Sequence, residues 1–84
     1  MASKSELMDW TEEALTQLGG EGSVVEVCRV VWDRHEGDLR SSDDLFYTWQ
    51  YDIRWAATKL RKAGRLEAHD VSSGNRAPWR LARP

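Results

Sequence analysis

Apolar residues recur at helical spacing in two stretches near the start of the chain. Ser3 to Glu6 and Ser23 to Glu26 each have the spacing of a capping box, which marks the first turn of a helix. Gly19-Gly20 is expected to end the first helix and Gly37 to lie near the end of the second, because glycine tolerates left-handed backbone. The apolar positions are Leu7, Trp10, Ala14, Leu15 and Leu18 in the first helix, then Val24, Val27, Cys28 and Val31 in the second.

A third amphipathic stretch follows a polar segment. Ser41-Ser42-Asp43-Asp44 is typical of a helix start, and residues 38–48 are expected to form either a short extra helix or an ordered loop. The third long helix is predicted over residues 48–63, with Gly64 as its stop. At about 100° per residue, one sector of this helix is apolar. Its members are Trp49, Ile53, Ala56, Ala57 and Leu60.

After Gly64 the pattern changes to alternation of apolar and polar residues. Residues 65–71 and 77–81 are predicted strands, and residues 72–75 form a turn cluster between them. Pro78 has no backbone N–H, which places the second strand at a sheet edge. Three helices followed by a hairpin is the order of a winged helix. The sequence therefore predicts one α+β domain over residues 1–84, frayed at 1–5 and 83–84: a helix-turn-helix core followed by a two-stranded wing.

Charge is distributed unevenly between the two parts of this chain. The 84 residues carry 12 Lys+Arg and 14 Asp+Glu, a net charge of −2. Residues 1–53 hold 4 basic and 12 acidic side chains, whereas residues 54–84 hold 8 and 2. A basic face could therefore bind a polyanion while the molecule stays mildly acidic. The alternative is that the two halves interleave in space and leave no basic patch.

The composition favours a cytoplasmic protein with no membrane partner. Mean hydropathy is −0.66 and 31% of the residues are charged. No apolar run approaches the ~20 residues of a membrane span, and the N-terminus lacks a signal-peptide stretch. Cys28 is the only cysteine, so no internal disulfide can form, and it is expected to be a small core residue.

The polar side of the third helix suits contact with DNA. Arg and Gln can bond guanine and adenine edges bidentately, and Thr can reach a base or a phosphate. By helical angle this stripe comprises Gln50, Arg54, Thr58, Arg61 and Arg65. At the wing tip, residues 72–76 offer Ser73, Asn75 and Arg76 for phosphate or minor-groove contacts. The alternative is an ordinary solvated face and an ordinary exposed turn.

Tyr51 and Trp55 lie on a third face of the same helix. Either the hairpin or residues 38–48 cover them, or they are exposed for a partner. An apolar patch near Phe46, Tyr47 and Trp55 could also join two copies into a homodimer that reads two DNA half-sites.

The segments Tyr51-Asp-Ile-Arg-Trp-Ala56, Leu60-Arg-Lys-Ala-Gly64-Arg-Leu66 and Pro78-Trp-Arg-Leu81 resemble the N-terminal winged-helix domain of Mrr-type restriction endonucleases. The resemblance covers about residues 7–82 and implies DNA binding, as in enzymes that cut modified DNA. It places Arg54 on the family's helix arginine and Lys62 on the lysine before the turn. The family's nuclease domain is not in these 84 residues, so no catalytic role is carried over. Phe46-Tyr-Thr-Trp49 replaces a proline-containing segment of the family, which leaves the docking of that loop open.

No catalytic, cofactor or metal site emerges from the sequence. His35 and His69 stand alone, and the adjacent carboxylates Glu12-Glu13 and Asp43-Asp44 read as helix charges. The leading hypothesis is thus a double-stranded DNA-binding protein, not an enzyme, with a role in restriction or transcription regulation. The alternative hypothesis is a protein–protein interaction or regulatory module that uses the acidic N-terminal half.

Overall fold

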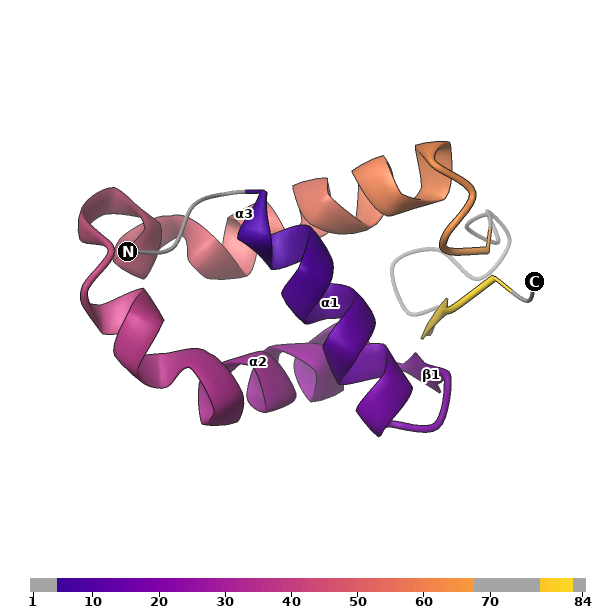
Figure 1. Ribbon diagram of the computed structural model, residues 1–84, viewed down its shortest axis with the longest axis horizontal. Coiled ribbons are helices and arrows are strands. Elements are labelled where there is room, and N and C mark those ends of the chain that lie inside the picture. Colours follow the sequence, from indigo (N-terminus) through magenta and orange to yellow (C-terminus); the bar gives the residue numbers. More distant parts are fainter. Residues whose placement is uncertain (1–4, 68–77, 83–84) are drawn as a thin grey trace.

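The computed structural model describes residues 5–67 and 78–82 of the chain. These residues form an α+β arrangement of helices with a small antiparallel sheet, compatible with the winged-helix order expected from the sequence (Figure 1). The elements in chain order are α1 (Glu6–Gln17), β1 (Glu21–Gly22), α2 (Val24–Arg40), α3 (Asp43–Lys62) and β2 (Trp79–Arg80). Helices α2 and α3 run along the long axis of the molecule, α1 crosses between them, and the sheet lies at one end.

Helix α1 begins later in the chain than the sequence predicted. Its N-cap is Ser5, whose side chain makes no capping bond, and Ser3 lies outside the described residues. The stop is as predicted, because Gly19 and Gly20 both have positive φ, at 89° and 106°.

Helix α2 begins with the predicted capping box. The Glu26 N–H donates to the Ser23 hydroxyl at 3.1 Å, and the Ser23 N–H donates to the Glu26 carboxylate at 2.9 Å. The expected end near Gly37 is wrong, since the helix continues to Arg40. The helix is kinked at His35. The turn after the kink packs against the core through Leu39, which is fully buried.

Helix α3 is longer than the sequence predicted. It begins at Asp43 with Ser42 as N-cap, so residues 43–48 are the first turns of α3 and form neither a separate helix nor a loop. The physical reason is Leu45, which is buried one turn before Trp49 and extends the apolar face toward the N-terminus. Gly64, with φ of 77°, follows the end of the helix as expected.

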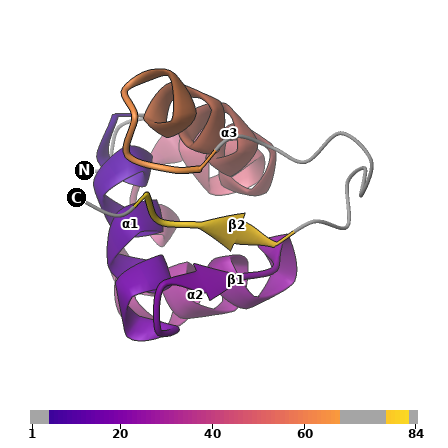
Figure 2. The same cartoon turned by 90° about the vertical axis from the view of Figure 1, so that its right-hand side faces the viewer.

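Strand β2 lies between two other segments of the chain (Figure 2). On one side it pairs antiparallel with β1, in the register Gly22 to Trp79, and on the other Leu66 bridges to Leu81. The expected position at a sheet edge is therefore wrong for the described strands. Pro78 precedes the first paired residue, so its missing N–H removes no ladder bond. Residues 68–77, with most of the predicted hairpin, lie outside the described residues.

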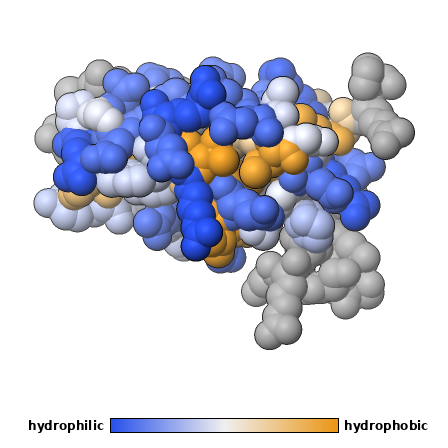
Figure 3. Space-filling model, turned by 90° about the horizontal axis from the view of Figure 1, so that it is seen from below, coloured by the Kyte–Doolittle hydropathy of each residue, from blue (hydrophilic) through white to orange (hydrophobic). Residues whose placement is uncertain are grey.

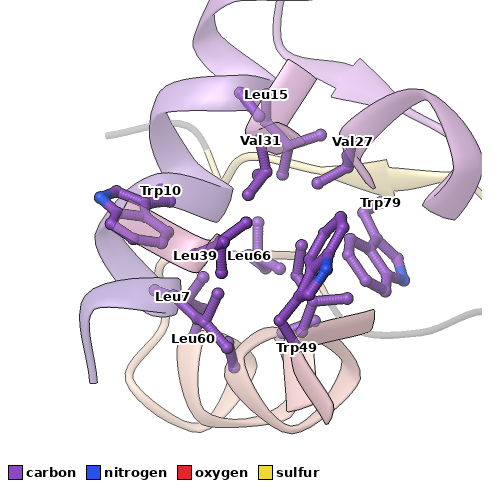
Figure 4. Close-up of a cluster of buried hydrophobic side chains, with 14 of the residues drawn as sticks. Leu7, Trp10, Leu15, Val27, Val31, Leu39, Trp49, Leu60, Leu66 and Trp79 are labelled. Carbon is purple, nitrogen blue, oxygen red and sulfur yellow. The ribbon is translucent and has the colours of Figure 1, made fainter. Parts of the chain in front are cut away.

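The hydrophobic core joins all three helices to the C-terminal segment (Figure 4). Leu7 and Leu15 of α1, Val31 of α2 and Leu60 of α3 are almost completely buried. Trp79 of β2 is 6% exposed and closes the core at the sheet end. In the described part of the chain, no helix is both long and apolar enough to cross a membrane. Nor do the described residues gather three or more side chains able to hold a metal ion.

Candidate nucleic-acid interface

Three residues of the predicted polar stripe are exposed on successive turns of α3. These are Gln50, Arg54 and Thr58, spaced four positions apart. Such spacing aligns side chains along one side of a helix. The Thr58 hydroxyl donates to the Arg54 carbonyl oxygen at 3.1 Å, and its own oxygen remains able to accept. The stripe thus presents a guanidinium, an amide and a hydroxyl group side by side.

Gln50 and Arg54 form one wall of a groove between α2 and α3. The groove has a volume of about 730 Å³. Burial raises the pKa of the Cys28 thiol on the α2 side, and the positive charge of Arg54 opposes this rise. Arg54 therefore lies near Cys28. The thiol is half-buried: it packs against the hydrophobic core, which confirms the expectation in part, and it also lines the groove.

Residues of α2 that the sequence analysis did not select complete this groove. Val25 and Arg29 lie one turn apart on α2, both are exposed, and both line the groove opposite α3. Val25 is 60% exposed. Figure 3, seen from the side of α2, shows hydrophobic side chains at the surface among hydrophilic ones. The four-residue spacing of Val25 and Arg29 indicates that the two residues lie on the same side of α2. The sequence does not show that this side faces the Gln50–Thr58 stripe, because that depends on how α2 packs beside α3.

Arg61 differs from the rest of the stripe because it is partly withdrawn from solvent. Its guanidinium lies 6.0 Å from the centre of the Trp79 ring, against the sheet. Its Nε atom is buried and has no hydrogen-bond partner among the described residues. This burial lowers the pKa of Arg61.

The remaining predicted contact residues fall into two groups. Lys62 is exposed at the end of α3, whereas Arg65 beyond it forms a 2.8 Å ion pair with Glu12 of α1. Ser73, Asn75 and Arg76 of the expected wing lie outside the described residues.

The acidic and basic halves of the sequence interleave in part. Besides the pair of Arg65 with Glu12, Arg80 of β2 pairs with Glu21 of β1 at 2.8 Å. In the described part of the chain, no ion pair involves Arg54 or Lys62. Arg54 and Lys62 of α3 thus keep positive charges that are uncompensated among the described residues, and these are fewer than the sequence count suggests.

Comparison of the chain with known protein families, with curated protein sequences and with solved structures gave no match.

Proposed function

We propose that the chain binds double-stranded DNA as a winged-helix domain. In this proposal α3 enters the major groove, and residues 72–76 act as the wing beside it. One observation carries the proposal: Gln50, Arg54 and Thr58 are exposed along one side of α3, and Arg54 has no carboxylate partner among the described residues. Arginine and glutamine are side chains that read base edges.

The order of the elements supports the same proposal. Three helices are followed by a C-terminal strand that lies between β1 and residues 66–67. This order leaves one face of the third helix free for DNA in winged helices. The resemblance of residues 7–82 to the N-terminal domain of Mrr-type endonucleases leads to the same function.

Within the proposed interface, we infer a different role for each residue from its surroundings. Gln50, Arg54 and Thr58 face the bases, and Arg29 of α2 contacts a phosphate across the groove. Lys62 adds a phosphate contact at the end of α3. Arg61 positions the sheet against α3 through Trp79, and Arg65 contributes less because Glu12 compensates its charge.

The alternative interaction module has less support. Glu12 and Glu13 of the acidic half already bind Arg65 and Arg34 within the fold. A basic partner would have to displace these internal pairs before it could use the two carboxylates.

The test is fluorescence anisotropy of a labelled random duplex, titrated with the full chain at three salt concentrations. We expect Arg54→Ala to weaken binding about tenfold, whereas Lys62→Ala, which removes a proposed phosphate contact, should make the log–log salt slope shallower by about 1. Arg34→Ala is the matched control, because Glu13 and Gln17 of α1 bind that guanidinium and Arg34 is not among the residues that line the groove. Absence of binding at low salt, or equal losses in Arg54→Ala and Arg34→Ala, would contradict the proposal.

A further inference from the structure

Helix α3 carries a row of aromatic side chains on a face separate from the Gln50–Thr58 stripe, in which Tyr47 and Tyr51 are exposed and Trp55 is half-buried against the core. Tyr47, Tyr51 and Trp55 follow one another at intervals of four residues. Tyr47 is 83% exposed and Tyr51 is 77% exposed, the highest values among the large hydrophobic residues of the described part. Aromatic side chains at such exposure are enriched where proteins meet other proteins.

Opposite charges flank this aromatic row along the helix. Asp44 precedes it in the first turn, while Lys59 and Lys62 follow it in the last turns, and all three are exposed. At about 100° per residue, these charges and the aromatic rings share a sector of about 120° on α3. Among the described residues none of the three charges forms an ion pair. Lys59 instead places its ammonium 5.8 Å from the centre of the Trp55 ring.

The row is complementary to itself when it is read in the opposite direction. Reversal about residue 53, midway between Tyr51 and Trp55, brings position 44 level with 62, position 47 with 59 and position 51 with 55. A carboxylate then meets an ammonium, an ammonium meets a tyrosine ring, and a tyrosine meets a tryptophan. A parallel arrangement would instead set like charges together.

We propose that this face of α3 binds the same face of a second copy, antiparallel and about a two-fold axis. A two-fold axis brings identical patches together, which is what the self-complementary pattern requires. A helix of 20 residues is about 30 Å long, so the contact is small for a protein interface. The dimer is therefore weak, and because its end pairs are exposed ions, salt weakens it further.

This proposal does not depend on DNA binding, although Lys62 belongs to both faces of α3. Two helices packed about 10 Å apart cannot occupy successive major grooves, which recur about every 34 Å. The α3–α3 dimer and the DNA complex are thus competing states, and the dimer is not a reader of two half-sites.

Sedimentation equilibrium of the full chain tests the proposal between about 10 µM and about 1 mM, where small interfaces dissociate. We expect the mass to rise from 9.7 kDa toward twice that value at low salt, and to rise less at high salt. Asp44→Lys and Lys62→Glu should each weaken the dimer about tenfold, because each sets like charges together at both ends of the contact. Glu67→Lys, the same charge change at an exposed position outside α3, is the control and should not alter the mass.

A mixture of the Asp44→Lys and Lys62→Glu variants provides the decisive measurement. At one end of the contact, the lysine introduced at position 44 would meet the glutamate introduced at position 62 of the other chain. At the other end, the unchanged Lys62 of the first variant would meet the unchanged Asp44 of the second. The mixture should therefore form a heterodimer at concentrations where each variant alone is monomeric.

Circular dichroism of each variant confirms that both chains are folded before they are mixed. A wild-type chain that is monomeric up to about 1 mM would overturn the proposal, since even small interfaces associate in that range. A mixture that stays monomeric, or single variants that dimerise like the wild type, would overturn it equally.

Discussion

Glu13 joins α1 to the kink in α2. Its carboxylate accepts from Arg34 Nε at 3.0 Å and lies 2.8 Å from His35 Nε2. His35 is the residue with non-helical backbone in α2, and its ring stacks on Trp10 at a centroid distance of 4.0 Å. The Glu13 carboxylate therefore contacts one edge of the His35 ring at the kink, while the Trp10 indole covers the face of that ring.

Glu13→Gln is expected to lower stability in a pH-dependent way. The hydrogen bond to His35 and the charge of Arg34 lower the pKa of Glu13 below its usual 4.5, so the folded state binds this proton less tightly than the unfolded state. The contribution of Glu13 is therefore complete above about pH 4.5 and is lost as the pH falls through the lower folded-state pKa.

Urea unfolding of wild type and Glu13→Gln at pH 7, 5 and 3 measures this effect. We expect a difference below about 1 kcal/mol at pH 7, because the pair is exposed, and a smaller one at pH 3. A difference that is the same at all three pH values would show that lost packing, rather than lost charge, causes the destabilisation.

At the residue scale, the sequence predicts a side chain's angle around a helix but not what it meets there. Arg54 and Arg61 lie only about 20° apart around α3 by helical angle. Arg54 nevertheless borders the groove beside α2, whereas Arg61 lies against Trp79. Trp79 is 18 positions after Arg61, and no helical periodicity relates the two.

At the element scale, the capping box is the local signal that the structure reproduces most closely. Ser23→Ala should destabilise the fold by about 1 kcal/mol, because it leaves the Glu26 N–H without its acceptor. Ser23→Asp should retain most of the stability, since aspartate caps as well as serine does. Thermal melting of the two variants checks this, and equal losses in both would mean that the hydroxyl contributes by some other contact.

Helix limits were predicted well where a glycine adopts positive φ and poorly where burial decides. Gly19 and Gly64 end α1 and α3 as expected, because their backbone requirement is local. The start of α3 and the end of α2 depend on Leu45 and Leu39. Leu39 stands in a polar segment and Leu45 directly follows one, and either leucine stabilises a helix only through a core that the rest of the chain provides.

At the scale of the whole molecule, the C-terminal strand joins the segment that follows α1 to the segment that follows α3. The Leu81 N–H donates to Gly20 on one side at 2.8 Å, and the Glu67 N–H donates to Arg80 on the other at 2.9 Å. Trp79 lies in the core beneath this strand.

Trp79→Ala is expected to cost about 3–5 kcal/mol, a large part of the stability of a domain this small. The loss should appear as a drop in the urea midpoint, with α1 and α3 unfolding together. Tyr51→Ala, which removes an aromatic ring that is 77% exposed, is the matched control and should change the midpoint little at low protein concentration. Similar midpoints for the two variants would contradict the core role of Trp79.

The α+β class and the exposed part of the α3 stripe could be predicted from the sequence, since both depend on short-range periodicity. The ion pairs that partly neutralise the basic half of the sequence could not be predicted in this way. Glu12 and Arg65 are 53 positions apart, and their 2.8 Å contact exists only because α1 packs beside the end of α3. Arg29 was missed for the same reason, because its place in the groove depends on how α2 packs against α3.

The sheet also sets the order in which the protein can be completed during synthesis. Glu21 and Arg80, which pair across β1 and β2, are 59 positions apart. Helical turns form within microseconds of leaving the ribosome, whereas translation adds about 5–20 residues per second. The sheet end of the core between the three helices therefore stays uncovered until Trp79 has been added to the chain and has left the ribosome. During that interval the nascent chain exposes apolar surface that a chaperone could bind.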